Sequence, residues 1–206
     1  MKLYHGTPSL FKSYSLDSLA EGSGIKFGAG IYLTEVYDTA ALYSFPRGKE
    51  SEHNYVYTVE VPDKTEVNYL PYPSPVQAEI IEKVEAILNE TLPEIAKSKG
   101  KLFRKYLAHR LVGVPNEGLQ TESKIDKATT LEGEKMASQL LLKAGVLYIE
   151  WPQGGWKSYP KCQKNYAVLD PSVIKIVQIE EIKVQLDDKG KFKKVLSSTP
   201  VEIPTV

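Results

Sequence analysis

The order of strand-type and helix-type segments constrains this chain most. Strand-type runs occupy residues 2–5, 30–34, 54–61, 146–151, 166–170 and 173–186. They alternate apolar and polar side chains or are rich in β-branched and aromatic residues, which is typical of strands. Strands at both ends with helices grouped in the middle predict an α+β fold, and the absence of regular strand–helix alternation disfavours a doubly wound nucleotide-binding fold.

The middle of the chain is predicted to hold three helices. Apolar residues recur at helical spacing over 76–88 and again over 102–111. The third helix is predicted to begin at a capping box formed by Thr129 and Glu132 and to end at Gly145.

The strand over 30–34 is predicted to bury Ile31 and Leu33 and to turn Tyr32 to the opposite face. Asp38 is predicted to cap a short helix that follows this strand. The strand over 54–61 is predicted to be half-buried.

Composition excludes several classes of function. Lys and Arg total 26 and Asp and Glu also total 26, so a polybasic role is excluded. The single cysteine, Cys162, and three scattered histidines disfavour a disulfide framework and a thiolate-rich zinc site, and we expect no bound metal. The start of the chain lacks a signal-peptide pattern and no apolar run reaches membrane-spanning length, so we expect a soluble, cytoplasmic protein without membrane contact.

Three short segments near the N-terminus carry the most specific signal. They read YHGT at 4–7, FGAGIYLT at 27–34 and AALY at 40–43. The chain has 13 tyrosines but only 5 phenylalanines, and a tyrosine ring can stack on a flat ligand while its hydroxyl makes a hydrogen bond. Each segment alone is weak evidence, and only the combination of the three in this order is persuasive.

In this order and spacing the three segments resemble the ADP-ribosyltransferase superfamily in its diphtheria-toxin and poly-ADP-ribose-polymerase branch. The later segments EKMASQLLLKAGVLYIEW and KNYAVLDPSVIKI are similar to the ADP-ribosyltransferase domains of phage and mobile-element polyvalent proteins. The resemblance runs from about residue 3 to 177. It implies a split, bent β-sheet core in a single domain over 1–206, with a helical insertion at about 76–145 and a C-terminal strand extension at about 178–206.

The resemblance also implies an NAD site. Gly6 would offer its backbone N–H and C=O to the nicotinamide carboxamide, and His5 would bond a hydroxyl of the adenosine-side ribose. Thr7 would brace the adjoining loop, and Gly30 belongs to the expected NAD-binding set. Tyr32 would form one wall of the nicotinamide slot.

The opposite wall of the slot is assigned to Tyr43, with Tyr37 as its competitor. Each ring stack is worth about 1 kcal/mol beyond burial. Tyr43 belongs to the predicted short helix, where its ring has the alternative of packing into the core.

The expected catalytic set is His5, Tyr32 and an acidic residue. In the family a glutamate opens the strand that here begins with Asn165, so this chain has an amide where a carboxylate is expected. Either Asn165 suffices, or another acid such as Glu150 enters the cleft, or catalysis is lost. Negative charge matters because cleavage of the glycosidic bond develops oxocarbenium character on the ribose.

The predicted function is NAD-dependent ADP-ribosyl transfer to a macromolecule with release of nicotinamide, in a phage or toxin-type effector. NAD is the co-substrate, and protein is favoured over nucleic acid as the acceptor. The alternatives are an inactive NAD-binding or interaction module and an NAD glycohydrolase. The basic run KGKLFRKY at 99–106 is interpreted as a solvated helix face rather than a phosphate site.

Overall fold

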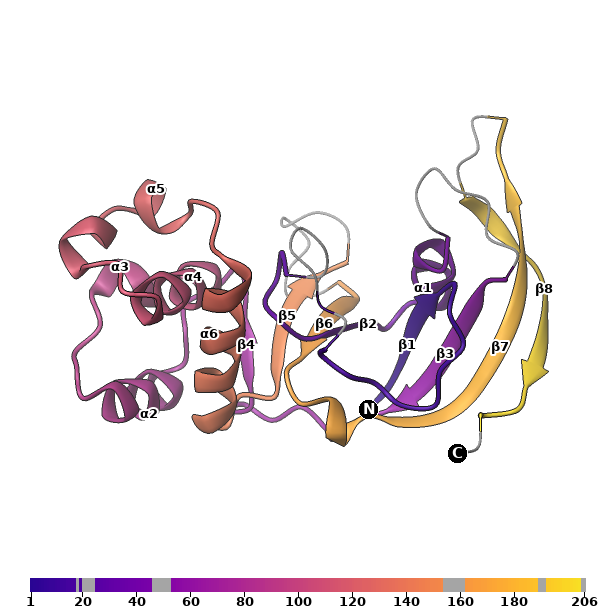
Figure 1. The fold of residues 1–206 in the computed structure, drawn as a ribbon, viewed down its shortest axis with the longest axis horizontal. Helices are drawn as coiled ribbons and strands as arrows, with labels where there is room; N and C mark the ends of the chain where they lie inside the picture. Colours follow the sequence, from indigo (N-terminus) through magenta and orange to yellow (C-terminus); the bar gives the residue numbers. More distant parts are fainter. Residues whose placement is uncertain (18, 20–24, 46–52, 154–161, 189–191, 205–206) are drawn as a thin grey trace.

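The structure is a computed structural model that describes residues 1–17, 19, 25–45, 53–153, 162–188 and 192–204. The strands are β1 (Lys2–Thr7), β2 (Ile31–Thr34), β3 (Tyr55–Glu60), β4 (Tyr69–Pro71), β5 (Tyr148–Pro152), β6 (Lys164–Val168), β7 (Lys175–Leu186) and β8 (Phe192–Val201). The α-helices are α1 (Tyr37–Tyr43), α2 (Ala78–Leu88), α3 (Glu94–Lys97), α4 (Gly100–Leu111), α5 (Glu122–Ile125) and α6 (Leu131–Lys143). Short 3₁₀ helices cover Asn116–Leu119 and Pro171–Val173. The predicted α+β class is confirmed (Figure 1).

The described strands form one mixed sheet of eight strands in the order β4-β5-β6-β2-β1-β3-β7-β8 (Figure 1). Every neighbouring pair is antiparallel except β4 and β5, which are parallel. The prolines around β4 indicated only a connection, so this strand was missed. Pro71 is tolerated there because β4 is an edge strand, where one row of backbone groups has no ladder partner.

The sheet is narrowly joined between β1 and β2. Tyr4 and Thr34 form the single register pair between these strands. On its other side β1 pairs with β3 without interruption from Lys2 to Thr7. The backbone groups that β1 directs toward β2 beyond Tyr4 are therefore free of a strand partner, and a cavity opens at this place.

The half-buried prediction for the strand over 54–61 is wrong, because all residues of β3 but the last are buried. This strand lies between β1 and β7, and both of its faces are covered. On one face Val56 packs with Ala40 and Ala41 of α1. On the other face, the Tyr57 ring stacks on Phe11 from the loop after β1, with centroids 4.4 Å apart.

The two faces of β2 follow the predicted alternation. Ile31 and Leu33 belong to a core cluster with Tyr166 and Val168 of β6. Tyr32 packs against a different cluster, which is formed largely by the helices between β4 and β5. The prediction that Tyr32 turns away from its apolar neighbours is confirmed.

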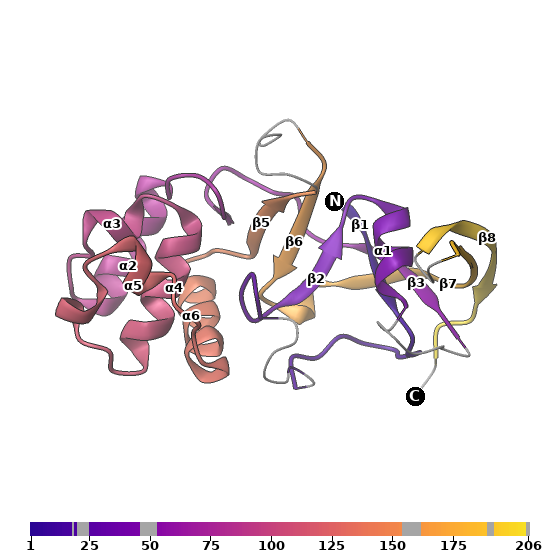
Figure 2. The ribbon, with the colours of Figure 1, turned by 90° about the horizontal axis from the view of Figure 1, so that it is seen from above.

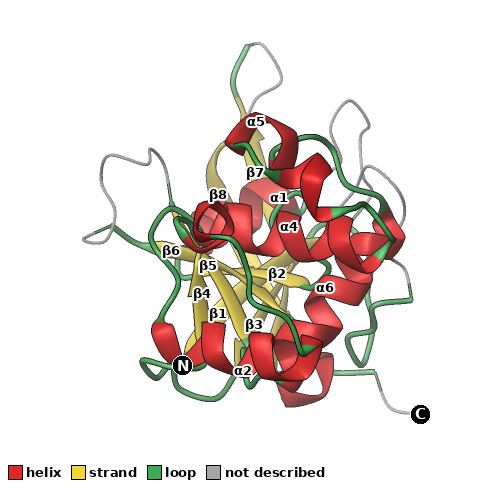
Figure 3. Ribbon diagram, turned by 90° about the vertical axis from the view of Figure 1, so that its left-hand side faces the viewer, coloured by secondary structure: helices red, strands yellow, loops and turns green. Residues whose placement is uncertain are grey.

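Five α-helices rather than the predicted three lie between β4 and β5, because α3 and α5 have only four residues each and give no periodic signal. They gather at the β4 end of the sheet (Figure 1); Figure 2 shows them on the β5 side, and in Figure 3 this end faces the viewer. Close packing of α4 and α6 depends on Gly133, where an added Cβ would lie 2.5 Å from the Ala108 carbonyl oxygen. No helix of the described ranges is long and apolar enough to cross a membrane.

Both predicted caps are displaced by one or two residues. Thr130, not Thr129, caps α6 by accepting a hydrogen bond from the Gly133 N–H. Thr129 instead donates to the buried Glu134 carboxylate. Asp38 lies inside the first turn of α1 and Val36 occupies the cap, so Asp38 acts only through its charge at the helix start.

Candidate functional site

A cavity of about 1100 Å³ lies where β1 and β2 part. Six of the eight predicted site residues line it: His5, Gly6, Thr7, Tyr32, Tyr43 and Asn165. The other lining residues are Tyr4, Pro8, Ser9, Leu19, Lys26, Phe27, Leu33, Thr34, Ala40 and Trp151. Its walls therefore come from β1, β2, β5, β6, α1 and two loops, and the volume exceeds the range of about 300–1000 Å³ usual for small-ligand sites.

His5 occupies the gap between the two separated strands. Its Nδ1 lies 2.9 Å from the carbonyl oxygen of Tyr32. Burial lowers the pKa of His5, and this hydrogen bond offsets part of that shift. The imidazole is thus neutral at pH 7 with its proton on Nδ1, so Nε2, which bonds no described residue, is left as an acceptor.

Gly6 is required by the packing of α1 against β1. A Cβ at this position would lie 1.6 Å from the Ala40 carbonyl oxygen. The resemblance implies a ligand contact for this glycine, and the packing of α1 is a separate steric reason for it.

The backbone of Gly6 also faces the cavity. Met1 and Val61 exchange both hydrogen bonds across the β1–β3 ladder. Hydrogen-bonded and non-hydrogen-bonded pairs alternate along an antiparallel ladder, so Gly6, which opposes Val56, belongs to a non-hydrogen-bonded pair. Its N–H and C=O therefore point away from β3 and into the gap beside Tyr32, which is the geometry an amide ligand needs.

Tyr32 fixes the loop that precedes β2. Its hydroxyl accepts a hydrogen bond from the Phe27 N–H at 2.8 Å and donates to the Gly28 carbonyl at 3.1 Å. Its ring meets Trp151 edge-on at a centroid distance of 5.2 Å. Burial raises the pKa of the Tyr32 phenol, so this hydroxyl stays protonated and both bonds persist at neutral pH.

Tyr43 and its competitor Tyr37 have different environments. Tyr43 lines the cavity and is 64% exposed. Tyr37 packs edge-on against Tyr4, with centroids 5.4 Å apart, and does not line the cavity. Burial and the nearby Glu180 raise the pKa of Tyr37. Of the two, Tyr43 is the ring available to a ligand.

Asn165 and Glu150 lie on opposite faces of the sheet. Asn165 pairs with Trp151 across β5 and β6 and shares its face, and its amide bonds no described side chain. Glu150 precedes Trp151 and points the other way, where it is 1% exposed and forms an ion pair with Lys64. The structure does not bring Glu150 to the cavity.

Gly30 and Thr7 have local roles. A Cβ on Gly30 would lie 2.8 Å from the Val168 carbonyl oxygen, so this glycine permits the close approach of β2 and β6 and does not line the cavity. Thr7 accepts a hydrogen bond from the Ser9 N–H at 3.2 Å, which braces the turn after β1.

Phe27, Trp151 and Lys26 are three of the lining residues that were not assigned to the cavity from the sequence. The Phe27 ring stacks on Trp151 at a centroid distance of 4.0 Å with an angle of 4° between the ring planes. The Nζ of Lys26 lies 5.5 Å from the Phe27 centroid, and Lys26 has no ion-pair partner in the described residues. Phe27 belonged to a quoted motif, but nothing in the sequence indicated its pairing with a residue 124 positions later.

The interpretation of residues 99–106 as a solvated helix face is wrong. All four basic side chains of this run line a second cavity of about 720 Å³. Arg104 is fully buried and the Lys105 side chain is 14% exposed. Lys99 and Lys101 remain partly exposed at the rim, while Arg104 and Lys105 are directed into the fold, so the basic pattern suggested solvent where the fold places a pocket.

Within the described residues, no group of three or more His, Cys, Asp or Glu side chains is arranged to hold a metal ion. Comparison of the chain with family models, with curated proteins and with solved structures found no match in any of the three. Chemical argument about the site must therefore rest on its own geometry.

Proposed function

We propose that this protein binds NAD in the cavity between β1 and β2 and transfers ADP-ribose to a macromolecular acceptor, releasing nicotinamide. One observation carries the proposal. His5, Gly6, Tyr32, Tyr43 and Asn165, which are up to 160 positions apart in the sequence, line one cavity. The finer assignment of the sheet to the split, bent ADP-ribosyltransferase type is part of the same proposal, supported by the single register pair between β1 and β2.

Each residue has a role that its environment supports. The outward N–H and C=O of Gly6 match the acceptor and donor of a carboxamide. Tyr32 and Tyr43 offer rings from β2 and α1 to the nicotinamide. The neutral His5 accepts from a ribose hydroxyl through Nε2. Lys26 is the one lysine or arginine among the described lining residues, and it offers its charge to the diphosphate.

The chemical step breaks the bond between C1 of the nicotinamide ribose and the pyridinium nitrogen. The electron pair of that bond leaves with neutral nicotinamide. The acceptor atom forms a bond to C1 and releases its proton to water. Asn165 orients the ribose hydroxyl, and because an amide carries no charge it stabilises the developing positive charge less than a glutamate would.

The neutral amide favours a second candidate, an NAD-binding module without transferase activity. Both candidates predict NAD binding, and only the first predicts turnover. The position of Glu150 also supports the inactive module, because this carboxylate lies behind the sheet and supplies no replacement charge. An NAD glycohydrolase differs from the transferase only in its acceptor: water takes the ADP-ribose in place of a macromolecule.

Two measurements test the proposal. Calorimetric titration with NAD should show binding that Tyr43→Ala weakens about tenfold, consistent with about 1–1.5 kcal/mol for a lost aromatic contact. Leu42→Ala is the matched control, since this neighbour on α1 is also exposed but does not line the cavity. Equal affinities for the two variants, or no binding by the wild type at millimolar NAD, would overturn the site.

Incubation with labelled NAD and a cell lysate then tests turnover. Label should appear on a macromolecule, and Asn165→Glu should increase its rate. Release of nicotinamide without a labelled macromolecule indicates the glycohydrolase, and intact NAD with measurable binding indicates the inactive module.

A further inference from the structure

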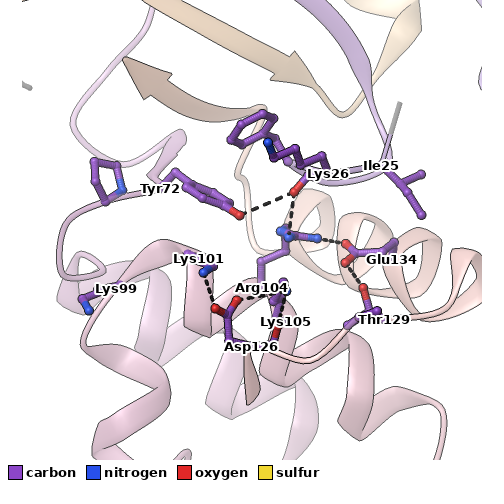
Figure 4. A pocket seen from close by; sticks show the side chains of 13 residues that line it. Ile25, Lys26, Tyr72, Lys99, Lys101, Arg104, Lys105, Asp126, Thr129 and Glu134 are labelled. Carbon is purple, nitrogen blue, oxygen red and sulfur yellow. Dashed lines mark hydrogen bonds and ion pairs between the residues drawn. The ribbon is translucent and has the colours of Figure 1, made fainter. Parts of the chain in front are cut away.

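The second cavity adjoins the first. It is lined by Ile25, Lys26, Phe27, Tyr72, Pro73, Lys99, Lys101, Arg104, Lys105, Asp126, Ala128, Thr129 and Glu134 (Figure 4). Lys26 and Phe27 line both cavities, so one loop separates them. A ligand in the second cavity would thus lie next to the wall of the proposed NAD site.

Positive charge is concentrated in this cavity. Five of its lining residues are cationic and two are carboxylates. A third carboxylate, Glu122, pairs with Lys99 at 2.7 Å, so two positive charges remain in excess in a chain whose formal net charge is zero. One carboxylate, Asp126, serves two ammonium groups: its Oδ2 lies 2.5 Å from Lys101 and its Oδ1 lies 3.0 Å from Lys105. The single carboxylate therefore holds both lysines in place and leaves this group of three side chains with one net positive charge.

Arg104 lies beneath the surface of the cavity, and its charge is balanced by one carboxylate. Its guanidinium is fully buried, is paired with Glu134 and donates to the Lys26 carbonyl at 3.2 Å (Figure 4). Its Nε has no hydrogen-bond partner in the described residues. Burial lowers the pKa of Lys105, Asp126 offsets part of that shift, and the neighbouring Arg104 and Lys101 add to the lowering. A bound anion would relieve this crowding of like charges.

We propose that this cavity binds a phosphate group of the acceptor, and that the acceptor is a nucleic-acid strand; the acceptor role rests on the proposed function. A strand is favoured over a phosphorylated protein side chain because the basic residues are distributed around a volume far larger than one phosphate. A strand also carries a phosphate at every nucleotide, so one can lie among the lysines while the adjacent nucleotide reaches the NAD cavity past Lys26 and Phe27.

The test compares two charge-matched double variants. Lys99→Gln with Lys101→Gln removes two lysines of the cavity and leaves Asp126 bonded to Lys105. Lys183→Gln with Lys194→Gln removes two exposed lysines from the β7–β8 end of the sheet. Binding of a fluorescein-labelled single-stranded oligonucleotide is followed by anisotropy at several salt concentrations, and melting curves confirm that both variants are folded.

We expect the cavity variant to lose at least tenfold in affinity and the control to retain it. The logarithm of the association constant decreases with the logarithm of the salt concentration, and the magnitude of this slope should be smaller by about 0.7 for each lysine–phosphate contact removed. Equal losses in both variants, or binding of a phosphopeptide without binding of the oligonucleotide, would overturn the inference. So would a parallel loss of NAD affinity in the cavity variant, because the lysines would then serve the NAD diphosphate.

The NAD titration keeps the two proposals separable. Normal NAD binding without oligonucleotide binding refutes the nucleic-acid acceptor and leaves the proposed function standing. Oligonucleotide binding without NAD binding refutes the proposed function while the phosphate site stands.

Discussion

The two cavities share a loop but are built in opposite ways. The cavity proposed to bind NAD opens where strand pairing stops, and two of its polar groups, the Gly6 backbone and the Asn165 amide, have no partners in the described residues. The cationic cavity is formed by side chains of α4 and its neighbours, which are tied together by ion pairs. Function at the first should thus depend on a few individual residues, and at the second on summed charge.

The largest effect is expected from Glu134→Ala. It leaves the buried Arg104 without its carboxylate, which should lower the free energy of unfolding by about 3–5 kcal/mol. Urea denaturation measures this. Glu132→Ala, an exposed glutamate in the same helical turn, is the control and should change stability by well under 1 kcal/mol. Similar effects in both would show that the buried pair does not support the cationic cavity.

Gly6→Ala tests the packing of α1 against β1 beside the first cavity. Its Cβ would overlap the Ala40 carbonyl, so α1 must shift, with an expected loss of about 3 kcal/mol or more. Gly118→Ala is the control, because the nearest atom to its Cβ would be 3.5 Å away. If Gly6→Ala melts at the wild-type temperature, α1 does not pack on β1 as described.

Tyr32→Phe should have a smaller effect on stability. The ring remains, but the Phe27 N–H and Gly28 carbonyl lose their partner, at an expected cost of about 1–2 kcal/mol. Because this loop separates the cavities, NAD affinity and oligonucleotide affinity should both decrease. A change in only one of them would mean that the loop does not couple the two sites.

The smallest effect is the pH dependence of His5. Its pKa in the folded protein lies below the ordinary value of 6.5, so below that pH the unfolded chain binds more protons than the folded one. Stability contributed by the neutral imidazole is complete above pH 6.5 and is lost as the pH falls, by at most about 1.4 kcal/mol per pH unit. The neighbouring Tyr14 and Tyr57 have raised pKa values and do not titrate in this range.

His109 also has a pKa lowered by burial, so stability alone does not isolate His5. NAD affinity does, because only His5 lines that cavity. The affinity should weaken as the pH falls through the lowered pKa of His5 in the wild type and in His109→Asn, but not in His5→Asn. An acid-induced loss that persists in His5→Asn would assign the titration to another group.

The sequence allowed much of the first cavity to be predicted and little of the second. Residues such as Tyr32 and Asn165 belong to short strands whose alternation indicates which face each side chain occupies. Trp151 was not assigned to the cavity because its role depends on which strands become neighbours in the sheet, and local patterns do not contain that information. For the same reason β4 was missed, since its three residues form a strand only through pairing with β5.

The basic run at 99–106 is a case in which the sequence pattern led to a wrong interpretation. A helix face with several cations ordinarily faces solvent. Here Arg104 points inward because α4 packs against α6 and against the loop at Lys26. Asp126 and Glu134, which hold these cations, lie 20 to 30 positions later in the chain, so no spacing rule connects them.

The central claim is that the Gly6 backbone and the Asn165 side chain face a nicotinamide-binding cavity. Amide resonances of the ¹⁵N-labelled protein during titration with NAD test it most directly. We expect the Gly6 backbone amide and the Asn165 side-chain amide to shift with the same binding curve, while the remote Gly118 and Gly145 amides stay in place. If both cavity amides remain unmoved at millimolar NAD, or if the shifts cluster elsewhere, the claim is contradicted.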